Sequence, residues 1–242
     1  PGAIFWMWLI AFLGMATNYA EAVLAQKTRI VDSEGIVHGG PVYYIKTAFR
    51  GKFGTFLAGF FSVAIILALG FMGCMVQSNS IASTCETAFG IPAWVWGIAV
   101  VAIAAYVFIG GVGRLAVPLM AIVYLIGGLI VLLANLPATG EAFALIFSCA
   151  FNPQAEIGGV TFGILAALAQ GAKRGLFSNE AGMGSTPHAH AQANVKNPHE
   201  QGTVALIGVF VDTFIVVTIT ALVVISVLYT GNGALAQGAY EG

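Results

Sequence analysis

The run from residue 53 to residue 85 contains no charged side chain and is apolar along most of its length. A helix of about 20 mostly apolar residues is enough to cross the roughly 30 Å hydrocarbon core of a bilayer, and this run is longer than that. Across the whole chain, 59% of the residues are hydrophobic and only 8% are charged. These features predict an all-α integral membrane protein that has the lipid bilayer as its surroundings.

Six segments are predicted to cross the membrane, within a single membrane domain that covers residues 1–242. If successive spans alternate in direction, every basic residue outside the broken span falls on one side of the membrane. The positive-inside rule places that side in the cytoplasm. The predicted spans are residues 1–27, 53–85, 91–110, 112–135, 158–193 (broken) and 202–229.

Two connections between spans have distinctive compositions. Residues 30–52 are basic and of mixed charge, and Pro41 followed by an aromatic pair predicts a short helix in the cytoplasmic interface. Residues 136–157 contain two prolines and three spaced phenylalanines, which predict an outer loop able to fold over an entrance.

Several classes of function are disfavoured by the charge and by the spacing of reactive side chains. A net charge of −1, with basic residues at helix ends rather than in a cluster, argues against a nucleic-acid partner. His188 and His190 are two residues apart, so on a helix they point to nearly opposite sides and cannot share one metal as an i, i+4 pair does. With His199, they are expected at the cytoplasmic surface. An enzyme is therefore not expected.

The broken span carries charge at membrane depth. Residues 158–172 would rise about 22 Å as a helix, so Lys173 and Arg174 would still lie inside the bilayer. Each would cost about 2.5–3.5 kcal/mol at the bilayer centre on insertion scales. We therefore expect both side chains to face an aqueous path or the protein interior.

Glycines and polar residues follow these two cations. We predict that the helix breaks over residues 174–180 and resumes over residues 181–193. A half-helix that begins inside a membrane presents free N–H groups, an arrangement that holds carboxylates in transporters with discontinuous helices. A kink without a ligand is the alternative, but the adjacent Ser178, Asn179 and Glu180 supply polar groups that a kink does not need.

Three other polar residues lie inside apolar spans. Gln77 either bonds a neighbouring helix or faces a ligand. Asp212 is the only acidic residue of the last span and lies near its middle, so it is a candidate ligand for a cation, with an ion pair to Lys173 or Arg174 as the alternative. Glu21, near the cytoplasmic end of the first span, is expected to support the open backbone of the broken helix.

Four motifs, in order along the chain, carry a resemblance to a known family. They are PGAIFWMWLIAFLG at residues 1–14, NYAE at 18–21, GGPVYYI at 39–45 and SNEAGMGS at 178–185. Together they resemble the alanine or glycine:cation symporter family, also called the sodium:alanine symporters. The resemblance implies a partial LeuT-like inverted-repeat fold, with the six spans as transmembrane helices two to seven of a longer transporter.

The resemblance also implies sodium-coupled symport of a small neutral amino acid, alanine or glycine, into a bacterial or archaeal cell across its plasma membrane. Na⁺ is then the coupling ion and no other cofactor is expected. Coupling to protons, transport of a larger neutral amino acid such as glutamine, and a channel are the alternatives. The residues expected to bind substrate are Gln77, Ser178, Asn179, Gly182 and Met183, and those expected to bind Na⁺ are Asp212 and Ser178.

Overall fold

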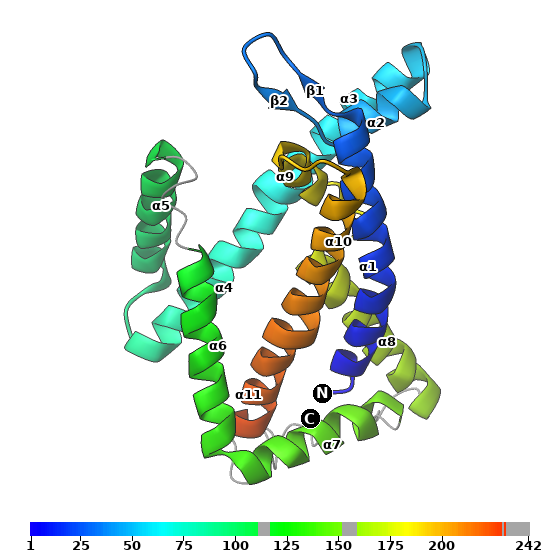
Figure 1. The fold of residues 1–242 in the computed structure, drawn as a ribbon. Helices are drawn as coiled ribbons and strands as arrows, with labels where there is room; N and C mark the ends of the chain where they lie inside the picture. Colours follow the sequence, from blue (N-terminus) through cyan, green and yellow to red (C-terminus); the bar gives the residue numbers. More distant parts are fainter. Residues whose placement is uncertain (111–116, 152–158, 229, 231–242) are drawn as a thin grey trace. The chain divides into compact units, whose positions relative to one another are not determined.

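The computed structural model describes residues 1–110, 117–151, 159–228 and 230 (Figure 1). Its contacts divide the chain into two compact units, which are described separately. One unit comprises Pro1–Ala48 and Val123–Gly242, and the other comprises Phe49–Ile122. The parts of the predicted spans at residues 112–116, 158 and 229 lie outside the described residues.

The unit Phe49–Ile122 contains the long uncharged run from which the membrane class was predicted. It forms one helix over Lys52–Phe89. This helix ends at Gly90, whose φ of 69° is a left-handed conformation that favours glycine. After the turn, a second helix packs back against it. The elements are α3 (Lys52–Ile65), η1 (Ile66–Gly73, a π-helical stretch), α4 (Cys74–Phe89) and α5 (Ala93–Gly110); helix α6 (Val117–Ala134) passes from this unit into the other.

The other unit is organised around its first helix, which packs against three later helices and also contacts α7. The last three elements form one long helix over Pro198–Leu228. The elements are α1 (Ala3–Thr28), β1 (Ile30–Val31), β2 (Val37–His38), α2 (Pro41–Ala48), α7 (Leu136–Phe151), α8 (Gly159–Asn179), α9 (Thr186–Gln192), α10 (Pro198–Val209), η3 (Phe210–Val217, π-helical) and α11 (Thr218–Leu228).

Glycines allow the helices of this unit to approach closely. A Cβ atom on Gly171 of α8 would lie 2.4 Å from the Ala3 carbonyl oxygen of α1, and one on Gly202 of α10 would lie 2.7 Å from Val23 Cγ2. Gly175, one turn after Gly171, faces the same helix. Small residues four apart are a common means of helix packing in membranes. They bring α8 and α10 against α1.

Residues 136–151 form helix α7, so the prediction of a loop across this region is wrong. Pro137 lies in the first turn, where a proline has no hydrogen bond to lose. Phe147 and Phe151 are four residues apart and share one helical face, and both rings contact Phe5 of α1. Pro137 therefore marks the start of a packed helix, which bends by 100° from the helix before it. Pro153 and the rest of the predicted loop, residues 152–157, lie outside the described residues.

The break in the fifth predicted span lies later than predicted. Helix α8 continues through Arg174, Gly175 and Ser178 and ends at Asn179, so the predicted break at residues 174–180 is wrong. The helix resumes at Thr186 instead of near residue 181. Gly175 stays helical. The absence of a side chain at this position leaves room for the close approach of α1.

The connection after α1 contains the short helix that Pro41 predicts, α2. Before it, β1 and β2 pair antiparallel, with Ile30 opposite His38; this small hairpin was not predicted.

Among the described residues, three helices are long and apolar enough to span a membrane, namely Ala3–Thr28, Lys52–Phe89 and Pro198–Leu228. A fourth span is added if the bent pair Ile122–Ala134 and Leu136–Phe151 counts as one. The apolar helix Ala93–Val107 is shorter than this. The described chain is thus mostly helical, with three or four candidate spans.

Candidate functional site

The break between α8 and α9 is built by residues in left-handed backbone conformations. Gly182 and Gly184 have φ of 78° and 76°, and Glu180 has φ of 53°, which is uncommon for a residue with a side chain. The Asn179 side chain accepts a hydrogen bond from the Ala181 N–H through Oδ1, at 3.0 Å. These features end the helix and expose backbone groups that α1 then contacts.

Two side chains of α1 hold the break. The Asn18 amide nitrogen donates to the Asn179 carbonyl oxygen at 2.8 Å, and Glu21 Oε2 accepts from the Gly182 N–H at 3.4 Å. Because they are three residues apart, Asn18 and Glu21 lie on the same side of the helix. Glu21 therefore contacts the open backbone, as predicted, and Asn18 shares this task.

The second half of the broken helix is also anchored to α1. Gln26 donates its amide to the carbonyl oxygens of His190 and Ala193, and Arg29 donates its guanidinium to those of Ala191 and Ala193. Carbonyls at a helix C-terminus lack partners within the helix, and a cation there is favoured by the helix dipole. The break and the far end of α9 are thus both fixed to α1.

Asp212 lies on the π-helical stretch η3, opposite the end of α8. Ser178 Oγ donates to Asp212 Oδ2 at 2.6 Å, and Thr213 Oγ1 donates to the same oxygen at 3.2 Å. Neither Lys173 nor Arg174, both exposed, pairs with it, because the only ion pair among the described residues joins Asp32 and His38. The alternative of a structural ion pair is therefore wrong for the described structure.

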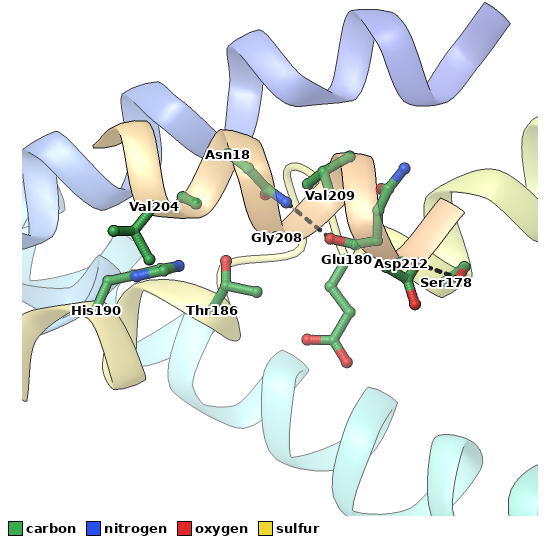
Figure 2. Close-up of a pocket in the computed structure, with 11 residues that line it drawn as sticks. Asn18, Ser178, Glu180, Thr186, His190, Val204, Gly208, Val209 and Asp212 are labelled. Carbon is green, nitrogen blue, oxygen red and sulfur yellow. Dashed lines mark hydrogen bonds between the residues drawn. The ribbon is translucent and has the colours of Figure 1, made fainter. Parts of the chain in front are cut away.

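A cavity of about 340 Å³ lies between the break, α1 and the long C-terminal helix. Figure 2 shows Asp212 and Ser178 close together at one side of it and His190 at the other. The lining residues are Asn18, Ser178, Asn179, Glu180, Thr186, His190, Val204, Ala205, Gly208, Val209 and Asp212.

The cavity brings together some of the predicted site residues. Ser178, Asn179 and Asp212 line it. Gly182 and Met183 belong to the loop of the break but are not among the lining residues. Gln77 is exposed on α4, in the other compact unit.

Eight of the eleven lining residues were not predicted as site residues, and three polar ones among them are Asn18, Thr186 and His190. Asn18 is 3% exposed inside an apolar helix, and that position was a signal that could have identified it. Thr186 offers no such signal, because threonine is common in membrane helices. His190 was expected at the surface, but its ring is half-buried at the cavity, with Nδ1 2.6 Å from the Gln201 amide nitrogen.

Comparison with known sequences gives the family. The profile of the sodium:alanine symporter family matches residues 1–240. The chain belongs to this family. The sequence-based assignment to this family is thereby confirmed.

The relatives of the chain include proteins named as symporters and an uncharacterized transporter. The chain is 43% identical over 230 residues to the sodium/alanine symporter AgcS of Methanococcus maripaludis, covering 92% of this chain and 50% of AgcS. It is 42% identical over 233 residues to an uncharacterized transporter of Haemophilus influenzae, covering 93% and 50%. It is 37% identical over 231 residues to the probable sodium/glutamine symporter GlnT of Bacillus subtilis, covering 93% and 47%. The chain spans about half the length of these relatives.

Proposed function

We propose that the full-length protein is a secondary transporter of the plasma membrane that couples uptake of a small neutral amino acid, alanine or glycine, to the inward movement of Na⁺. The observation that carries this proposal is the juxtaposition of a broken helix and the Asp212 carboxylate at one cavity, in a chain of a symporter family. Polar backbone at membrane depth is tolerated where it lines a cavity or is buried in protein.

The substrate is assigned to the break. Ser178 and Asn179 offer hydrogen-bonding side chains at the end of α8, and Gly182 and Met183 continue the polar loop. Gln77, which belongs to the other compact unit, stays a substrate ligand predicted from the sequence. An amide can bond either the carboxylate or the ammonium of an amino acid, which is why it suits a zwitterion.

Na⁺ is assigned to Asp212 and Ser178. Both hydrogen bonds to Asp212 are accepted by Oδ2, so Oδ1 is free to coordinate a cation. Ser178 Oγ donates one of these hydrogen bonds and still has lone pairs that can coordinate a cation. Hard cations prefer such oxygen ligands. The C-terminal end of α8 adds negative partial charge beside them.

The finer architecture is part of the same proposal. We place the six predicted spans as helices two to seven of a LeuT-like inverted-repeat fold, with α8 and α9 as the discontinuous helix. In such folds, discontinuous helices near the midplane form the sites for substrate and ion.

Uptake measurements on the full-length protein in liposomes test the proposal. We expect accumulation of labelled alanine only with an inward sodium gradient. Accumulation driven by a proton gradient alone would favour the proton-coupled alternative, and glutamine uptake in preference to alanine would favour a larger substrate. Single-channel currents would favour a channel. No amino-acid flux under any gradient would refute the proposal.

A further inference from the structure

Asp212 lies on a stretch of helix whose turns hold more residues than those of an α-helix. Hydrogen bonds link residues four apart in an α-helix and five apart in a π-helix. The π-helical stretch η3 (Phe210–Val217) separates the α-helices α10 and α11. Because each residue turns an α-helix by about 100°, one extra residue rotates α11 by about that angle relative to α10, compared with a continuous α-helix. The register of η3 therefore sets the direction of the Asp212 side chain.

Both flanks of η3 are held by contacts that fix which way they face. On the α10 side, Gly202 packs so closely on α1 that a Cβ atom would lie 2.7 Å from Val23 Cγ2. On the α11 side, Leu222 and Ile225 are buried in a hydrophobic core with residues of α6 and α7. The extra residue is therefore accommodated between these two contacts, in the stretch that carries Asp212.

Two hydrogen bonds link η3 to α1 through Thr218, the first residue of α11. Trp8 Nε1 donates to Thr218 Oγ1 at 2.8 Å, and Thr218 Oγ1 donates to the Thr213 carbonyl oxygen at 3.1 Å. These directions follow because an indole N–H only donates and a backbone carbonyl only accepts. The second bond spans five residues, the spacing of a π-helix. The Thr220 hydroxyl, by contrast, bonds the Val216 carbonyl four residues back, as in an α-helix.

Thr213 connects this pair of bonds to the carboxylate. Its side chain is fully buried, and its Oγ1 donates at 3.2 Å to Asp212 Oδ2, the oxygen that also accepts from Ser178. The other end of the chain of bonds is fixed as well, since Trp8 packs against the hydrophobic core and its ring contacts Phe147 of α7. A continuous series of hydrogen bonds thus runs from α1 to the candidate cation ligand.

We propose that Thr218 and Trp8 are positioning residues, which hold η3 in the π-helical register that directs Asp212 toward Ser178 and the cavity. This inference rests on the proposed function, because it takes Asp212 as a ligand of Na⁺. Neither Thr218 nor Trp8 lines the cavity, so both act through Thr213. Loss of the Thr218 hydroxyl lowers the population of the register that binds Na⁺, and the apparent affinity for Na⁺ falls in proportion.

The test is alanine uptake by the full-length protein in liposomes, measured as a function of external sodium. Thr218→Val removes the hydroxyl and keeps nearly the same shape. It should raise the sodium concentration at half-saturation about threefold to tenfold, as the loss of one net hydrogen bond predicts. Half-saturation by alanine at saturating sodium should stay at the wild-type value, because excess Na⁺ restores the binding register. Thr218→Ser keeps the hydroxyl and should restore the wild-type sodium dependence.

The matched control is Thr220→Val. Thr220 is two residues further along α11, and its hydroxyl likewise bonds a carbonyl of its own helix and an aromatic side chain of another helix, Tyr124. These bonds end at Val216 and Tyr124 and not at a neighbour of Asp212. Thr220→Val should therefore keep the wild-type half-saturation by sodium, even if its melting temperature falls as much as that of Thr218→Val.

Two combined variants show whether the effect passes through Asp212. Trp8→Phe removes the indole N–H and should raise the half-saturating sodium concentration, but added to Thr218→Val it should raise it no further. In an Asp212→Asn background, Thr218→Val should have no additional effect, because the carboxylate that it positions is gone. Independent contributions would instead add in both combinations.

The outcomes separate this proposal from the proposed function. Wild-type half-saturation by sodium in Trp8→Phe and in Thr218→Val would overturn the positioning role, and Trp8→Phe alone decides if Thr218→Val does not fold. An equal rise in Thr220→Val would also overturn it. If Asp212→Asn still raises half-saturation in these cases, the cation site stands without the positioning residues. Absence of sodium-driven alanine uptake would refute both proposals.

Discussion

Replacing Asp212 with asparagine tests the cation site directly. The substitution removes one negative charge but keeps an oxygen that can accept the hydrogen bond from Ser178 Oγ, which is 2.6 Å from Asp212 Oδ2 in the wild type. Since Asp212 forms no ion pair with Lys173 or Arg174, no cation is left unpaired by the change. We therefore expect Asp212→Asn to fold and to reach the membrane.

The expected size of the effect follows from the charge that is lost. Two unit charges 4 Å apart interact by about 4 kcal/mol at the effective dielectric constant of a protein surface. An amide oxygen still coordinates Na⁺, so the net loss should be smaller, about 1.5–3 kcal/mol, as for hydrogen bonds to charged groups. This corresponds to a roughly tenfold to hundredfold higher sodium concentration at half-saturation.

The assay is alanine uptake in liposomes as a function of external sodium, with folding checked by size-exclusion chromatography and thermal unfolding. Asp32→Asn is the matched control, because Asp32 is an acidic residue that does not line the cavity. Half-saturation by sodium that is the same in Asp212→Asn as in the wild type would remove Asp212 from the cation site.

Three further outcomes follow from packing and electrostatics outside the cavity. Gly171→Ala should lower the free energy of unfolding by about 1–3 kcal/mol, because its Cβ would overlap backbone atoms of α1. The control is Gly140→Ala, on an open helix surface, which should not lower it. Equal melting temperatures for Gly171→Ala and the wild type would contradict this packing. Arg29→Ala should speed hydrogen exchange of the amides of α9, whose terminal carbonyls it binds; unchanged exchange would show that the anchor is dispensable. Burial, and to a smaller extent the Glu21 carboxylate, raises the pKa of Tyr44 to about 12. An absorbance titration of the wild type should therefore show one tyrosine that ionises about two pH units above an exposed tyrosine, and the Tyr44→Phe variant should lack it.

The long apolar helices could be predicted from the sequence because length and composition are enough to identify them. Ala3–Thr28, Lys52–Phe89 and Pro198–Leu228 correspond to predicted spans. The position of the break could not be predicted, because a glycine either unwinds a helix or lets another helix approach. Gly175 is helical and packs on Met7, whereas Gly182 has a positive φ. Only the backbone conformation separates these two uses.

The candidate site could be predicted only in part, for a related reason. Ser178 and Asp212 stand out as polar residues in or beside apolar segments, and they are hydrogen-bonded to each other. Asn18 and Thr186 reach the cavity because of how α1 and α9 are rotated about their axes. That rotation is set by tertiary contacts such as those of Gly14, where a Cβ would lie 3.1 Å from Ala181 Cβ.

The attachment of both halves of the broken helix to α1 bears on how the cavity keeps its shape. Asn18 and Glu21 bind the break, and Gln26 and Arg29 bind the end of α9 one to two turns further along the same helix. An unwound segment alone would lose much of any binding energy in ordering itself. Because α1 is a continuous 26-residue helix, it holds the two halves at a fixed separation. A displacement of α9 relative to the break therefore requires either that these hydrogen bonds break or that α1 moves with it.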